Sequence, residues 1–165
     1  MTAAIAVLLA VTLAAAATDV RARRIPNVLT GGAAVAALAL HVSGGVVAEL
    51  TCIAAMSAAF ALGSLAFSAG WFGGGDVKLI AAACGLAGFP GALALVLYIL
   101  VCGALLALVT AAVSGRLGAL LRSTAGIAVR GAATERTLLP YGVAIAAGSI
   151  VYAISTLAPA LRLTP

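Results

Sequence analysis

The stretch ALALVLYILVCGALLALVTAAV, residues 92–113, runs for 22 residues without a charge. As a helix it rises about 1.5 Å per residue, enough to cross the roughly 30 Å hydrocarbon core of a bilayer. The rest of the chain is similar, since 65% of all residues are hydrophobic and 8% are charged, and the mean hydropathy is +1.28. No soluble fold could bury that much apolar surface, so we expect an integral membrane protein.

Five further apolar stretches lie outward from this one, separated by polar, glycine-rich or proline-bearing segments. Runs of this length fit helices better than the strands of a barrel, which alternate over about ten residues. We therefore expect an all-α, polytopic membrane protein with about six transmembrane helices in one membrane-embedded domain, residues 1–165. The expected spans are Ala3 to Thr18, Val28 to Val42, Val46 to Ala69, Val77 to Phe89, Ala92 to Val113 and Leu138 to Ala158.

The span from Val77 to Phe89 is short, because a helix of this length rises only about 20 Å. We expect the glycine loop before it, or the Phe89 to Gly91 turn after it, to dip below the headgroups. Irregular backbone at that depth survives only where it lines a wet cavity or is buried in protein. The loop that holds Asp76 is therefore expected to line such a cavity.

The cations indicate the orientation. If six helices alternate, only Arg162 falls on one side, and the other side receives Arg21, Arg23, Arg24, Lys78, Arg116, Arg122, Arg130 and Arg136. The positive-inside rule makes that side cytosolic and places both termini outside. The net charge of +5 then reflects topology and contact with anionic lipid headgroups, and it does not argue for nucleic acid.

The only two aspartates, Asp19 and Asp76, both stand at the cytosolic ends of expected spans. A carboxylate near hydrocarbon costs about 3 kcal/mol and commonly lines a water-filled functional site. Two carboxylates in one site cannot both ionise cheaply, so the pair holds one proton and offers an acid and a base together. Such a pair can hydrolyse a peptide bond without a metal or a covalent intermediate.

Residues beside Asp76 allow alternative interpretations. Gly73, Gly74 and Gly75 can adopt positive φ and let a substrate backbone approach closely, or they form a flexible turn that Asp76 caps at the helix start. Lys78, like the three glycines, is a candidate for positioning the substrate. It can pair with a carboxylate, or its stem can lie along the membrane with the charge among headgroups. Tyr141 fits an interfacial aromatic belt better than a donor near the site.

Little else in the sequence suggests chemistry. Cys52, Cys84 and Cys102 are scattered without a C-x-x-C pair, and His41, the only histidine, falls on the opposite face. We therefore expect no metal and no cofactor, with the cysteines serving as small packing residues. The arginines and leucines of residues 115–136 fit an interfacial helix and a solvated basic loop about equally.

Three motifs carry a resemblance to a known family: Asp19-x-Arg-x-Arg-Arg-Ile-Pro-Asn27, Gly73-Gly-Gly-Asp-Val-Lys-Leu79 and Pro140-Tyr-Gly-Val-Ala-Ile-Ala-Ala-Gly148. Together, and in this order, they resemble the type IV prepilin peptidases, which are membrane aspartic proteases of the Gly-x-Gly-Asp type. The resemblance implies that Asp19 and Asp76 are the catalytic pair in a bacterial cytoplasmic membrane. It also implies a prepilin or pseudopilin substrate, whose leader is cut at the cytosolic face after a glycine that precedes a hydrophobic helix.

Larger members of that family carry, after the first helix, a cytosolic insert with paired C-x-x-C motifs that is associated with N-methylation. Only Asp19 to Asn27 occupies this place here, so no methyltransferase activity and no zinc insert are implied. The chain is similar to the short, peptidase-only branch of tight-adherence (Flp) pilus systems, and archaeal preflagellin peptidases are an alternative of similar length. A non-enzymatic transporter or pilus-assembly scaffold is the rival class, although transporters tend to hold carboxylates near the midplane of repeated helices.

Overall fold

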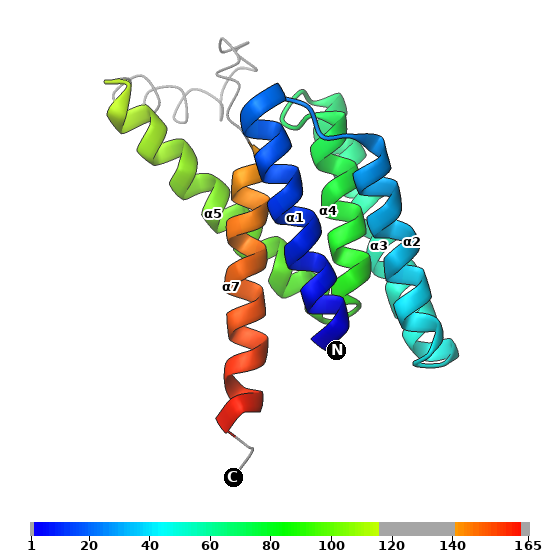
Figure 1. Ribbon diagram of the computed structural model, residues 1–165. Helices are drawn as coiled ribbons and strands as arrows, with labels where there is room; N and C mark the ends of the chain where they lie inside the picture. The colour runs from blue at the N-terminus through cyan, green and yellow to red at the C-terminus, as the bar shows by residue number, and fades with distance from the viewer. Residues whose placement is uncertain (1, 116–140, 163–165) are drawn as a thin grey trace.

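The computed structural model describes residues 2–115 and 141–162, and within them the chain forms six helices (Figure 1). These are α1 (Thr2–Ala22), α2 (Asn27–Val42), α3 (Val46–Ser68), α4 (Gly74–Ala87), α5 (Gly91–Val113) and α7 (Tyr141–Arg162). By length and composition α1, α3, α5 and α7 can cross a membrane, and α2 is a shorter apolar helix. The expectation of an all-helical, multi-pass membrane protein is confirmed for the described residues.

Some helix ends differ from the expected ones. α1 continues four residues beyond Thr18 to Ala22, and α4 begins at Gly74, three residues before Val77. Hydropathy marks where side chains stop being apolar, whereas a helix continues while its backbone hydrogen bonds continue. Arg23 ends α1 with a φ of 49° and donates its N–H to the Asp19 carbonyl over 2.8 Å. Both aspartates therefore lie inside helices and not in the loops where the sequence placed them.

α4 is the central helix of the bundle. It packs most extensively against α2 and α3 and also contacts α1 and α5, whereas α7 packs mainly against α1 and α5. The buried residues of α4 are Val77, Leu79, Ala81, Ala82, Ala83, Cys84, Gly85 and Leu86. Most of them are small, which lets neighbouring helices approach closely. With 14 residues, α4 rises only about 21 Å, so the expectation that this segment is short is confirmed.

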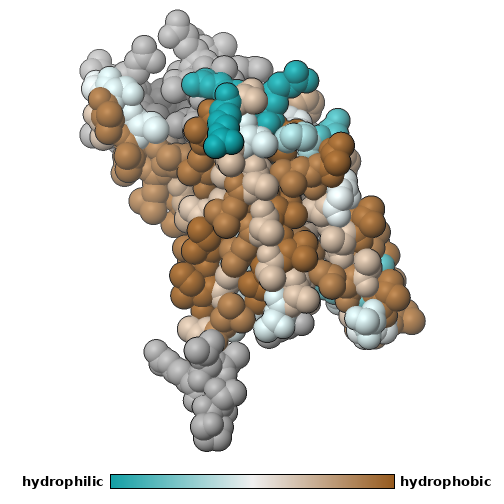
Figure 2. All heavy atoms as spheres, viewed as in Figure 1, coloured by the Kyte–Doolittle hydropathy of each residue, from teal (hydrophilic) through white to brown (hydrophobic). Residues whose placement is uncertain are grey.

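The two ends of the bundle differ in polarity. The C-terminal end of α1 and the first residues of α2, α4 and α7 lie together at one end, and the N-terminus lies at the other (Figure 1). Hydrophilic residues gather at the first end, above a mostly hydrophobic band (Figure 2). We call this first end, which carries the α1–α2 loop and the start of α4, the polar end. Arg21, Arg24 and Lys78 are exposed there, in agreement with the expected alternation.

Four further cations of that face, Arg116, Arg122, Arg130 and Arg136, lie outside the described residues. So does the interfacial helix expected over 115–136, apart from Gly115.

Candidate active site

Asp19 continues the buried face of α1. The residues of α1 that face the bundle recur every three or four positions, as expected for one side of a helix; they are Ile5, Leu8, Thr12, Ala15 and Asp19. The Asp19 side chain is only 9% exposed. The helical period therefore turns this carboxyl inward, toward the other helices of the polar end.

The first turn of α7 supplies the partner of Asp19. The backbone N–H of Gly142 donates a buried hydrogen bond of 2.9 Å to Asp19 Oδ2. The first N–H groups of a helix have no partner within the helix, and its N-terminus favours negative charge. A Cβ at position 142 would lie 3.0 Å from both Cβ and Oδ2 of Asp19, so a glycine here lets the carboxylate reach the backbone.

Asp76 lies in the first turn of α4, three residues after its N-cap. The N-cap is Gly73, and its N–H donates a hydrogen bond of 3.1 Å to Asp76 Oδ2. The interpretation of Asp76 as the N-cap is therefore wrong. Because the carboxylate reaches back to the residue before the helix, it stabilises a helix that starts at Gly74, as the acidic half of a capping box does.

The glycines before Asp76 do not adopt the expected positive φ. Gly74 and Gly75 are helical, and Gly73 has a φ of −78°, so none of the three adopts positive φ. Two of them instead make room for neighbours. A Cβ at Gly73 would lie 2.9 Å from Asp76 Oδ2, and a Cβ at Gly75 would lie 3.2 Å from Cβ of Ile25. The expected glycine loop is thus a closely packed helix start.

The Asp76 carboxyl lies within electrostatic range of Asp19. Burial raises the pKa of Asp76 to about 6, the Gly73 N–H opposes this shift, and the negative charge of Asp19 adds to it. Asp19 comes from α1 and Asp76 from α4, two helices that pack against each other. The structure therefore brings the two predicted site residues together at the polar end, with Asp76 disposed to keep a proton.

Tyr141 forms part of the same site. Its ring meets Phe72 edge-on, with ring centroids 4.7 Å apart, and its phenol lies within electrostatic range of the Asp76 carboxyl. A Cβ at Gly103 of α5 would lie 2.7 Å from the Tyr141 hydroxyl. Tyr141 is therefore packed between α5 and the segment before α4, and the aromatic-belt interpretation is not favoured.

A sequence profile of the type IV leader peptidase family matches residues 6–108. The chain belongs to the type IV leader peptidase family. Membership implies cleavage of prepilin leader peptides, suggests an aspartic endopeptidase activity and places the protein among multi-pass proteins of the inner membrane. Searches among curated proteins and among solved structures gave no match.

The matched region of this leader peptidase family member holds both aspartates but ends before α7. The Gly142 contact to Asp19 therefore comes from outside it. Gly142 stands within the Pro140 to Gly148 motif, but the sequence alone does not indicate a role for it. The available signal was a glycine in the first turn of a helix, where backbone N–H groups are free to bind an anion.

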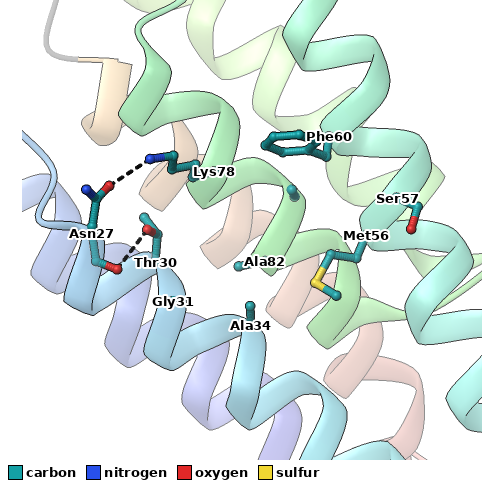
Figure 3. Close-up of a pocket in the computed structure, with 10 residues that line it drawn as sticks. Asn27, Thr30, Gly31, Ala34, Met56, Ser57, Phe60, Lys78 and Ala82 are labelled. Atoms are coloured by element: carbon teal, nitrogen blue, oxygen red, sulfur yellow. Dashed lines mark hydrogen bonds between the residues drawn. The ribbon is translucent and has the colours of Figure 1, made fainter.

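Lys78 points away from the aspartates in this family member. Its Nζ donates a hydrogen bond of 2.9 Å to Oδ1 of Asn27, at the start of α2 (Figure 3). Two residues along a helix correspond to about 200° of rotation, so Lys78 and Asp76 face nearly opposite sides of α4. Across residues 2–115 and 141–158, Lys78 pairs with no carboxylate. Of its two interpretations, pairing with a carboxylate is thus not favoured.

The described residues of this family member contain no group of three or more His, Cys, Asp or Glu side chains placed to hold a metal ion. Cys52 and Cys84 are buried as free thiols. His41 lies in the last turn of α2, at the end opposite Asn27, where its Nδ1 is 2.8 Å from the Ala37 carbonyl oxygen. The histidine is therefore far along α2 from the two carboxylates.

Proposed function

We propose that Asp19 and Asp76 are the catalytic pair of an aspartic endopeptidase. The proposed substrates are type IV (Flp-like) prepilins or pseudopilins, whose leader is removed at the cytosolic membrane face. The observation that carries this proposal is the convergence of the only two aspartates on the polar end, from two helices, α1 and α4, that pack against each other. The prepilin chemistry follows from the family.

The surroundings of the two carboxyls support a division of roles. Asp19 accepts the Gly142 N–H at the N-terminus of α7, which orients its carboxylate, and we assign it the role of general base. Asp76, with its pKa raised to about 6 mainly by burial, holds the shared proton. Asp19 then takes a proton from water as the water oxygen attacks the scissile carbonyl carbon, while the Asp76 proton hydrogen-bonds to the carbonyl oxygen. As the tetrahedral intermediate collapses, Asp19 returns its proton to the leaving amine.

The connection after α1 supports the peptidase-only assignment. Only four residues, Arg23 to Pro26, join α1 to α2, so no domain with paired C-x-x-C motifs is inserted there. We infer that the chain removes leaders without methylating the new amino terminus. The exposed cations Arg21, Arg24 and Lys78 beside the aspartates support a site that faces the cytosol.

The decisive experiment is leader release from a purified prepilin by Asp19→Asn and Asp76→Asn variants. Each substitution keeps the size of the side chain but removes the acid–base group, so turnover should fall at least about a hundredfold. Glu49→Gln is the matched control, because it removes a carboxylate from the first turn of α3 at the opposite end. Wild-type turnover in either aspartate variant, with unchanged melting in detergent, would overturn the proposal. Faster cleavage of an archaeal preflagellin would instead favour the alternative substrate.

A further inference from the structure

A second feature of the bundle lies on the other side of α4. α2 and α3 form the walls of a groove of about 540 Å³, and α4 forms its floor (Figure 3). Its lining is apolar and mostly small, and it includes Gly31, Ala34, Met56, Phe60, Ala81 and Ala82. Several lining residues are exposed, so the groove is open to the surroundings of the bundle, which in a membrane are lipid.

The groove is separate from the aspartate pair. Lys78 lines it, and Lys78 and Asp76 face nearly opposite sides of α4. Ile25 of the α1–α2 loop also packs against Gly75 in the first turn of α4. A substrate helix in the groove would therefore leave its cytosolic end on the wrong side of α4 for attack at Asp19 and Asp76. The groove needs a different occupant.

Charge and size indicate the occupant. Lys78 and Asn27 stand at the mouth of the groove at the polar end, where Lys78 uses one of its three N–H donors on Asn27 Oδ1. No carboxylate within residues 2–115 and 141–158 neutralises this ammonium group. A membrane-spanning helix about 10 Å wide and 30 Å long fills more than roughly 2,000 Å³, several times the volume of the groove. A slender apolar chain with an anionic head fits both features.

We propose that this groove binds an anionic phospholipid of the cytosolic leaflet, with an acyl chain between α2 and α3 and the headgroup phosphate on Lys78. Basic pockets between helices on the cytosolic side are suited to anionic headgroups. The apolar lining replaces contacts that the acyl chain would otherwise make with other lipids, and the ammonium group selects for negative charge. The inference does not rest on the proposed peptidase activity, because bound lipid can be measured without a substrate.

Two adjacent glycines provide a matched pair of variants. A Cβ at Gly31 or at Gly32 meets no atom within 4 Å, so a larger side chain can be introduced at either position without a clash at its Cβ. Only Gly31 lines the groove. Gly31→Leu should therefore fill the space for the acyl chain, whereas Gly32→Leu should leave it open. Lys78→Met keeps an apolar stem but removes the charge.

Native mass spectrometry of the delipidated protein, supplied with equal phosphatidylglycerol and phosphatidylcholine, measures both effects. Wild type and Gly32→Leu should retain phosphatidylglycerol preferentially, and Gly31→Leu should lose the retained lipid. Lys78→Met should lower the preference for phosphatidylglycerol about fivefold, as expected for one cation near a headgroup. Equal retention by Gly31→Leu and Gly32→Leu, or no headgroup preference in wild type, would refute the site.

A photo-crosslinking amino acid at position 57, which lines the groove, identifies the occupant in membranes. A mass increase equal to one phospholipid supports the proposal. Capture of a peptide, or of a second copy of the chain, in place of lipid would overturn it, because a protein partner would then occupy the groove.

Discussion

The two carboxyls are held in place by backbone N–H groups from different parts of the chain. Asp19 accepts from Gly142, 123 residues away, whereas Asp76 accepts from Gly73, three residues away. The local contact depends on one helix start, and the distant one depends on the docking of α7 against α1. The position of the Asp19 carboxyl should therefore be more sensitive than that of Asp76 to changes elsewhere in the bundle.

The pH dependence of cleavage tests the role of Asp76. Burial and the charge of Asp19 raise its pKa to about 6, so this carboxyl is protonated below that pH and ionised above it. If Asp76 supplies the shared proton, kcat/KM for leader release should fall as the pH rises through about 6. A bound substrate that excludes water would raise this pKa further, so the midpoint for kcat, which reports the enzyme–substrate complex, should lie at higher pH. A rate that increases steadily from about pH 5 to about pH 8 would contradict the assigned role.

The pH dependence of protein stability provides a second, independent measure of the protonation of Asp76. A folded-state pKa above the usual 3.8 means that folding favours the protonated carboxyl. Asp76 therefore makes its full contribution to the free energy of unfolding below about pH 4, and this contribution is lost as the pH rises through about 6. The melting temperature in detergent should follow this trend in wild type, and Asp76→Asn should remove that part of the pH dependence.

Gly142 should act as a positioning residue. In Gly142→Ala the new methyl group would meet Cβ and Oδ2 of Asp19 at 3.0 Å, which displaces the carboxylate from the Gly142 N–H. We expect kcat to fall about tenfold with little change in KM, because small displacements of a catalytic group are costly. Steady-state kinetics measure this effect, with Gly32→Ala as a control at an open position of α2. An unchanged kcat would show that the Gly142 contact does not orient Asp19.

At the level of elements, glycines set how closely α5 and α7 approach. A Cβ at Gly148 would lie 2.7 Å from the backbone N and Cα of Ile99, atoms that cannot move aside as a side chain does. α7 in turn carries Gly142 to Asp19. The contact between α5 and α7 therefore helps to set the geometry of the polar end.

Gly148→Ala should destabilise the bundle by separating these helices. Overpacking of this kind costs about 1–3 kcal/mol, so thermal or denaturant unfolding in detergent should shift toward lower stability. Gly32→Ala has open space around its Cβ and should unfold like wild type. If Gly148→Ala and Gly32→Ala unfold at the same temperature or denaturant concentration, α5 and α7 can move apart without a loss of stability, and the prediction is wrong.

The whole molecule is polar at the end that holds the aspartates and mostly hydrophobic along its sides (Figure 2). This asymmetry predicts the orientation, with the α1–α2 loop in the cytosol and the α2–α3 turn outside. Ser43 in that turn and Arg24 in the loop are both exposed, so each can report the side on which it lies.

Thiol labelling in intact cells tests this orientation. In a background with Cys52, Cys84 and Cys102 replaced by alanine, a membrane-impermeant maleimide should label Ser43→Cys directly. Arg24→Cys should react only after the membrane is permeabilised. The reverse pattern would place the aspartates outside and would exclude cleavage at the cytosolic face.

The sequence by itself determined the membrane-helix class, the two aspartates and their common face. These features depend on composition and on local order along the chain, since long apolar runs must be helical in lipid. Only the tertiary structure decided that Gly142 reaches Asp19, that Lys78 turns to Asn27 and that Gly74 and Gly75 are helical. The first two contacts depend on how helices distant in sequence dock and on which of their faces meet. The third depends on where a side chain caps the start of a helix. Hydropathy contains no information on either.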